Sequence, residues 1–219
     1  ANSDGNGFMQ SRIDLSEGDL ARAINALRVE RGIASSETPS GELNATFVVE
    51  GGGTPPAELI GGASGSGEVR LKAARIDDFN LSIMPDLPSG FDALGTEVTE
   101  EKVREITERL LRSGPTDLGD VALPFALSDG TVRVQAATQR TADAELDGNL
   151  RLDLRSGMLE AEVGIALDAG DGAIEGAEPY FRLLLNGPVL APERSLDVTE
   201  LTNFASLRAF EIERRRVEA

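Results

Sequence analysis

The stretch that decides the fold covers residues 121–167 and reads VALPFALSDGTVRVQAATQRTADAELDGNLRLDLRSGMLEAEVGIAL. Apolar residues alternate with small or polar residues along most of it, and a period of two sends every second side chain of a β-strand to the same face. Asp129-Gly130 and Arg155-Ser156-Gly157 interrupt the alternation where a tight turn fits. The stretch therefore predicts an antiparallel β-meander with one apolar face and one polar face.

Similar alternation occurs on both sides of this stretch. Residues 8–15, 41–50, 67–73 and 180–185 predict further strands, and residues 85–95 are expected to form a loop. A faint repeat relates Gly67-Glu68-Val69-Arg70-Leu71 to Gly148-Asn149-Leu150-Arg151-Leu152. Duplication and convergence on a common β-pattern explain this short match about equally well.

Three segments carry apolar residues at helical spacing instead. The first follows a potential N-cap at Ser16 and stops at Gly32, the second lies between Thr99 and Gly114-Pro115, and the third follows Asp197. A sheet with one apolar face must cover that face with helices, another sheet or a ligand. We therefore predict an α+β fold: an antiparallel, curved, one-sided β-sheet (a meander) with about three amphipathic helices covering part of its apolar face.

The chain is expected to form a single domain over residues 1–219, with possible halves at 1–95 and 115–219 joined by helix 99–113. No apolar run approaches the roughly 20 residues that a transmembrane helix needs. The first residues lack the basic and apolar regions of a signal peptide. Because the sequence ends inside a helical pattern without a C-cap, we expect it to be a fragment of a longer protein.

The composition excludes several kinds of site. The chain has Cys 0 and His 0, so it has no thiol nucleophile, disulfide, imidazole base or Cys/His zinc site. Its formal net charge of -17 would repel phosphate backbones, so nucleic acid is not an expected partner. The simpler interpretation of this acidity is that it keeps the protein soluble, rather than that it forms an acidic binding patch.

Three remaining motifs carry little chemistry. The glycine-rich residues 61–67 lack the Gly-Lys-Ser/Thr ending of a phosphate-binding loop, and a flexible loop is the favoured interpretation. Asp168, Asp171 and Glu175 are not spaced like the ligands of a calcium loop. Any acid pair among the 38 acidic residues could serve a hydrolase, but the sequence singles out none. We therefore predict no enzyme activity, no cofactor, no catalytic residue and no metal ligand.

The second half of the chain resembles the C-terminal region of AsmA-like proteins. The resemblance rests on residues 147–154 with the strand opening at 157–159, and most specifically on residues 184–198, LLNGPVLAPERSLDV. That last segment is similar to a "G-P-x-x-A-P-x-R-x-L-D-V" ending followed by a helix in alphaproteobacterial members. Residues 40–43 and 65–67 are similar to an "S-G-x-L … G-S-G" run of the same family.

This resemblance implies a periplasmic domain of an envelope protein, anchored in the inner membrane outside this chain and active in outer-membrane assembly. AsmA-like proteins are related to TamB-like and bridge-like lipid-transfer proteins, whose curved sheets form grooves for acyl chains. The partners that it implies are phospholipid acyl chains and other envelope proteins.

The function expected from these observations is non-enzymatic lipid transport or outer-membrane assembly, with the apolar sheet face as a candidate surface for acyl chains. Because three amphipathic helices are available to cover that face, self-coverage is the favoured interpretation for this fragment. The alternatives are a structural or protein-interaction module whose helices cover the core completely, and an acid-pair hydrolase. The residues expected to face lipid are Leu43, Phe47, Val69, Leu71, Leu123, Phe125, Leu150, Leu152, Val163 and Ile165.

Overall fold

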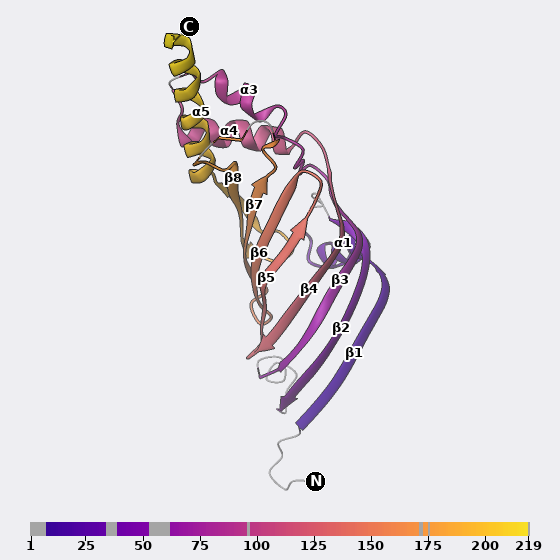
Figure 1. The fold of residues 1–219 in the computed structure, drawn as a ribbon. Helices are drawn as coiled ribbons and strands as arrows, with labels where there is room; N and C mark the ends of the chain where they lie inside the picture. The colour runs from indigo at the N-terminus through magenta and orange to yellow at the C-terminus, as the bar shows by residue number, and fades with distance from the viewer. Residues whose placement is uncertain are drawn as a thin grey trace.

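A single antiparallel sheet forms the body of the protein (Figure 1). The computed structural model describes residues 8–33, 39–52, 62–95, 97–170, 173–174 and 176–218. Within them nine strands pair in sequence order, each with its neighbours along the chain. They are β1 (Phe8–Asp19), β2 (Ser40–Gly52), β3 (Ser64–Ile76), β4 (Thr116–Ser128), β5 (Thr131–Arg140), β6 (Ala144–Asp153), β7 (Met158–Leu167), β8 (Tyr180–Pro188) and β9 (Glu193–Asp197).

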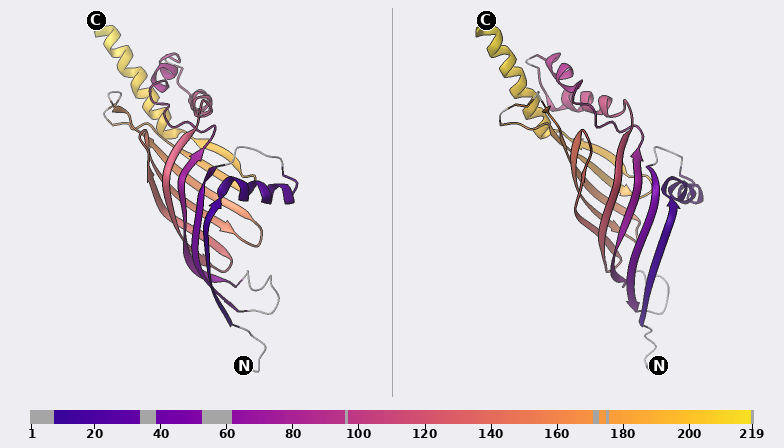
Figure 2. Two further views of the ribbon diagram at one scale, coloured as in Figure 1. Left: turned by 90° about the vertical axis from the view of Figure 1, so that its right-hand side faces the viewer. Right: turned by 45° about the vertical axis from the view of Figure 1, so that its right-hand side comes forward.

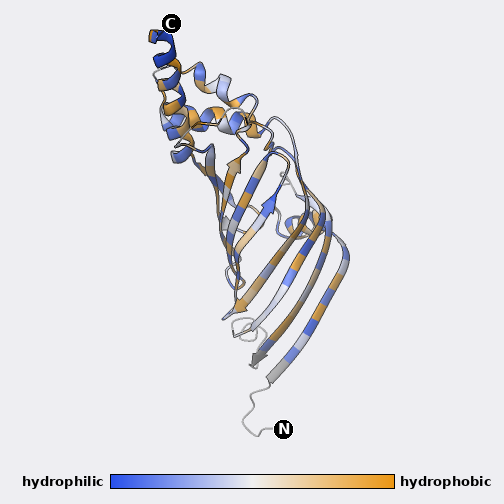
Figure 3. Ribbon diagram, in the orientation of Figure 1, coloured by the Kyte–Doolittle hydropathy of each residue, from blue (hydrophilic) through white to orange (hydrophobic). Residues whose placement is uncertain are grey.

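The predicted meander is confirmed in β4 to β7. More buried and more exposed residues alternate along β4, β6 and β7, and Figure 3 shows that the sheet carries both hydrophobic and hydrophilic residues. The turn between β4 and β5 has φ of 50° at Asp129 and 70° at Gly130. Positive φ at both central residues is the geometry of a tight hairpin turn, which explains the Asp-Gly pair. The two halves suggested by the sequence, 1–95 and 115–219, share one continuous sheet, because β3 of the first half pairs with β4 of the second along most of its length.

The described helices are α1 (Leu20–Glu30), α3 (Leu87–Asp92), α4 (Glu100–Leu111) and α5 (Thr199–Glu218). Three correspond to the predicted helices, and Thr99 caps α4 by accepting a hydrogen bond from Lys102 N at 3.4 Å. The expected cap of α1 at Ser16 is wrong. β1 continues to Asp19, whose carboxylate caps the helix by accepting a hydrogen bond from Arg22 N at 2.9 Å.

The expected loop at residues 85–95 is also wrong, because it contains α3. This helix has only six residues, too few for its periodicity to be evident in the sequence. Its Leu87 and Phe91 are completely or almost completely buried, with 0% and 1% of their surface exposed. Residues four apart lie on the same face of a helix, so these two side chains hold α3 against the rest of the protein.

The main hydrophobic core lies at one end of the sheet, beneath α3, α4 and α5. These helices form a cap over the apolar ends of β6 to β9, and Figure 2 shows α5 projecting beyond that end. The prediction that helices cover part of the apolar face is therefore confirmed. The core residues from the sheet and its following segment are Ala144, Leu146, Ile165, Leu167, Phe181, Leu196 and Val198.

The sheet is strongly curved, so that its two edges bend toward each other (Figures 1 and 2). Helix α1 lies on the open side of this curve, next to β1 and β2. Its Arg28 is buried and donates a hydrogen bond from Nε to the carbonyl oxygen of Leu190, at 2.9 Å, in the turn between β8 and β9. This contact joins parts of the chain near the two opposite edges of the sheet.

Candidate functional site: an apolar groove on the concave face

The register of the strands places the predicted lipid-facing residues on one face of the sheet. Directly opposed residues of an antiparallel pair point to the same side. Leu43 pairs with Leu71, and Val69 pairs with Leu123. The strand pairs further along continue this row on the same face as far as Leu150, Leu152, Val163 and Ile165. Ten residues identified from alternation alone thus form one continuous surface.

Nine of these residues are half-buried, and the tenth is not accessible. Ile165 has 0% of its surface exposed and belongs to the core under the cap helices. Its expected role in facing lipid is therefore corrected to a structural one. The physical reason is its position near the end of β7, where it joins the hydrophobic cluster that includes residues of the cap helices. The candidate site consists of the other nine.

The apolar face is the concave one. Leu127, Val134 and Leu159 point to this side and are only 8%, 7% and 6% exposed, although they lie outside the cluster under the helices. Ala122 and Ala126, small residues of β4 on the opposite face, are exposed. Side chains on the inside of a curved sheet converge and shield one another, whereas those on the outside diverge. We call the concave apolar surface formed by the nine residues of the candidate site, outside the cap helices, the groove.

An aromatic pair marks the middle of the groove. The rings of Phe47 on β2 and Phe125 on β4 are 6.1 Å apart between centroids, with an interplanar angle of 56°. Gly67 on β3 lies between them and pairs with both residues. A Cβ atom at Gly67 would lie only 2.8 Å from Phe125 Cζ. Glycine is therefore needed here so that the two rings can meet across the central strand.

The groove is wider than the sequence-based list. Ile13 and Leu15 extend it to β1, where they are 45% and 46% exposed. Leu183 and Leu185 extend it to β8, where they pair with Val163 and Ala161 of β7. The signal that could have found all four is the same period-two alternation in residues 8–15 and 180–185. Hydrocarbon side chains dominate this surface, which suits dispersion contact with apolar ligands rather than bond-making chemistry.

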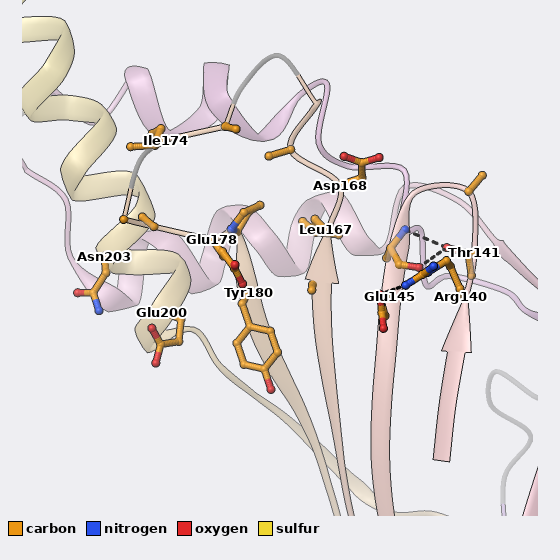
Figure 4. Close-up of a pocket in the computed structure, with 18 residues that line it drawn as sticks. Arg140, Thr141, Glu145, Leu167, Asp168, Ile174, Glu178, Tyr180, Glu200 and Asn203 are labelled. Carbon is orange, nitrogen blue, oxygen red and sulfur yellow. Dashed lines mark hydrogen bonds and ion pairs between the residues drawn. The ribbon is translucent and has the colours of Figure 1, made fainter. Parts of the chain in front are cut away.

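A second hollow lies beside the cap, on the polar side of the sheet (Figure 4). It has a volume of about 1090 Å³ and is lined by the ends of β5 to β8, by described residues of the segment between β7 and β8, and by the start of α5. Figure 4 shows Glu145 and Glu200 on opposite sides of Tyr180, and Glu145 forms an ion pair with Arg140. The carboxylates do not converge on a common point, so this geometry does not favour acid-pair hydrolysis.

The other candidate motifs have structural roles where they are described. Gly65 and Gly67 belong to β3 rather than to a flexible loop, and residues 53–61 lie outside the described residues. Asp168 accepts a hydrogen bond from Gly170 N at 3.0 Å, while Asp171 and Glu175 also lie outside the described part. Among the residues that the structure describes, no cluster of three or more Asp, Glu, His or Cys side chains is suited to hold a metal ion.

Within the described ranges, no helix combines the length and the apolar character needed to cross a membrane. Comparison of the chain with protein-family models, curated proteins and solved structures found no significant match.

Proposed function

We propose that this chain is a non-enzymatic lipid-binding module that holds acyl chains in its concave apolar groove. The observation that carries the proposal is the half-buried state of nine apolar residues on one continuous face. Phe47, Phe125 and Leu152 are examples: they lie on the sheet surface outside the core that the cap helices cover. A ligand with flexible hydrocarbon chains would remove this surface from water.

The expected driving force is hydrophobic. Each buried methylene contributes about 0.8 kcal/mol, so a chain lying along several strands gains affinity without a specific polar contact. The groove offers few charged groups to an acyl chain, because charged side chains such as Arg70 and Arg151 lie on the opposite face of the sheet. The proposal therefore places the lipid headgroup outside the groove, in water.

The cellular role that we propose for this binding is lipid transport or outer-membrane assembly in the periplasm. The support for that role is the resemblance of residues 184–198 and 147–154 to AsmA-like proteins. Phospholipids and envelope proteins would then be its partners, and a membrane anchor would belong to a part of the protein outside this chain.

Native mass spectrometry of the purified chain, with extraction and identification of bound lipid, tests the proposal. We expect phospholipid at a defined stoichiometry, either co-purified or taken up from vesicles. Ala161→Trp should fill the groove between Leu150 and Leu185 and reduce the bound fraction at least about tenfold. The matched control is Ala122→Trp on the opposite face, which should bind normally.

Leu152→Asp provides a second test by placing a charge in the groove. Thermal denaturation of each variant identifies any loss of binding that comes from unfolding. A clean lipid-free mass for the folded wild-type chain after incubation with vesicles would contradict the proposal.

The alternative is a structural or protein-interaction module. It is favoured by α5, which projects past the other cap helices (Figure 2) and carries the exposed apolar residues Phe210 and Val217, with 67% and 79% of their surface accessible. A lipid-free wild-type chain that captures a protein through α5 would support this alternative.

A further inference from the structure

The outer edge of β1 is unpaired in the described part of the chain. β1 is the first strand in the sheet order and pairs only with β2. Its other edge therefore presents a row of backbone N–H and C=O groups, which is a template for pairing with another strand. On the groove side of this strand, Ile13 and Leu15 are 45% and 46% exposed. The apolar face thus reaches the edge without cover.

The polar side of β1 carries two opposite charges at alternate positions. Arg12 and Asp14 have 67% and 56% of their side chains exposed, and Arg12 Nε lies 3.0 Å from an Asp14 carboxylate oxygen. Asp14 also accepts a hydrogen bond from Thr46 Oγ1 on β2, at 2.9 Å. On the polar face, a cation therefore precedes Ile13 in the sequence and an anion follows it.

This pattern is self-complementary in only one nearby antiparallel register. If Ile13 faces Ile13 of a second copy, each Arg12 lies opposite an Asp14, and Leu15 lies opposite Ser11. If the register is centred on Arg12 instead, two arginines face each other, and if it is centred on Asp14, two aspartates do. Opposite charges across a strand pair stabilise it and like charges destabilise it, so the register centred on Ile13 is favoured.

We propose that β1 pairs antiparallel with β1 of a second copy of this chain, with Ile13 opposite Ile13. The two copies are related by a two-fold axis perpendicular to the sheet. This symmetry keeps both apolar faces on the same side and joins the two grooves into one surface. It also covers Ile13 and Leu15, the exposed apolar residues at the edge.

The backbone of β1 limits the length of this pairing. The register with β2 shifts between Leu15 and Gly18, and Glu17 has a φ of 57°. A bulge of this kind bends the strand and ends regular pairing. The interface therefore centres on residues 10–16. Its backbone hydrogen bonds determine the orientation, and the two Arg12–Asp14 pairs determine the register.

Disulfide cross-linking tests the register directly, because the natural chain has Cys 0. Ile13→Cys should form a disulfide-linked dimer under mild oxidation, because each residue 13 faces its own counterpart. Leu15→Cys is the matched control: it lies on the same face and is equally exposed, but its own counterpart is about 13 Å away in this register. A mixture of Ser11→Cys and Leu15→Cys chains should cross-link as the heterodimer. Equal cross-linking at positions 13 and 15 would overturn the register.

Light scattering and charge-reversal variants test the association itself. The wild-type chain should reach twice its 23.1 kDa mass as its concentration rises. Arg12→Asp and Asp14→Arg each place like charges opposite each other, and each should raise the dimer dissociation constant about tenfold. The double variant Arg12→Asp/Asp14→Arg should restore dimerisation. A chain that stays monomeric, or a double variant no better than the single ones, would overturn the proposal.

Discussion

Asn149 on β6 accepts a hydrogen bond, through Oδ1, from the backbone N–H of Ala136 on β5, at 3.2 Å. Ala136 has a φ of 50°, and the β5–β6 register shifts between Val134 and Ala137. The asparagine therefore satisfies a backbone N–H that the strand ladder leaves unpaired at a bulge.

The same arrangement occurs in two other strand pairs. Glu17 N on β1 donates to Asn44 Oδ1 on β2 at 3.1 Å, and Ala73 N on β3 donates to Asp120 Oδ1 on β4 at 3.1 Å. Both donors also have positive φ and lie in a register shift. The pairs β1–β2, β3–β4 and β5–β6 thus share one type of bulged antiparallel pairing. Bulges increase local twist and bend a strand, so this repeated feature explains the curvature of the sheet.

The first prediction concerns this hydrogen bond. Asn149→Ala should reduce the free energy of unfolding by about 1 kcal/mol, because the Ala136 N–H loses its protein partner but can still reach water. Urea denaturation measures this change. Asn186→Ala, at an exposed position on β8, is the control and should change stability by less than about 0.5 kcal/mol. Equal effects of the two substitutions would show that the hydrogen bond contributes nothing.

These bulges also show what the sequence could not reveal. The faint repeat between residues 67–71 and 148–152 matched two segments that are not equivalent in the structure. Residues 67–71 lie on β3, which carries a bulge, whereas residues 148–152 lie on β6, which supplies the acceptor. Convergence on a common β-pattern explains that match. The true repeat depends on φ at Ala73 and Ala136, and neither residue type indicates a positive φ.

The strands and the composition of the groove followed from the sequence because period-two alternation is a local signal. The short strand β9 and helix α3 did not, since each has too few residues for a clear period and depends on tertiary packing. The burial of Ile165 was hidden for a related reason. Its alternation matches that of Val163, which is half-buried and packs against the same cluster, so only the distance from the cap separates the buried residue from the accessible one.

The second prediction tests whether the contact between the rings of Phe47 and Phe125 requires glycine at position 67, which lies between them. Gly67→Ala should reduce the free energy of unfolding by about 1–3 kcal/mol, because the new Cβ would clash with Phe47 Cβ. It would also lie 2.5 Å from the backbone oxygen of Thr46 and 2.8 Å from Phe125 Cζ. Gly148→Ala is a matched control on the same face. Its Cβ would meet Val163 Cγ2 at an ordinary 3.6 Å, so the change should be close to neutral. Urea denaturation measures both changes: if the two variants have the same m-value, the difference between their unfolding midpoints gives the difference in their stability.

The third prediction separates the two halves of α5. Phe204 is completely buried in the cap, whereas Phe210 on the same helix is 67% exposed. Phe204→Ala should destabilise the protein by about 3–5 kcal/mol through the cavity that it leaves. Phe210→Ala should change stability by less than about 0.5 kcal/mol. Thermal denaturation followed by circular dichroism checks both, and a similar loss in the two variants would mean that the end of α5 is packed in solution.

The fourth prediction concerns Asp197, which connects the sheet to α5. Its Oδ1 accepts hydrogen bonds from Thr199 N at 3.1 Å and Thr199 Oγ1 at 2.7 Å, and its Oδ2 lies 3.3 Å from Arg182 Nη1. The hydrogen bonds from Thr199 are the main cause that lowers the pKa of this carboxyl group below its usual value of 3.8. The ionised carboxylate is therefore the form that the folded protein stabilises.

The lowered pKa fixes the sign of the pH dependence. The stabilisation is fully present at pH values well above the ordinary pKa and is lost as the pH falls through the lower pKa of the folded state. Asp197→Asn should reduce the free energy of unfolding at pH 7, since a neutral amide accepts weaker hydrogen bonds from Thr199 and Arg182. Urea denaturation of both proteins between pH 7 and pH 3 should show this difference shrinking below about pH 4. A difference that stays constant over that range would show that the charge of Asp197 does not stabilise the junction.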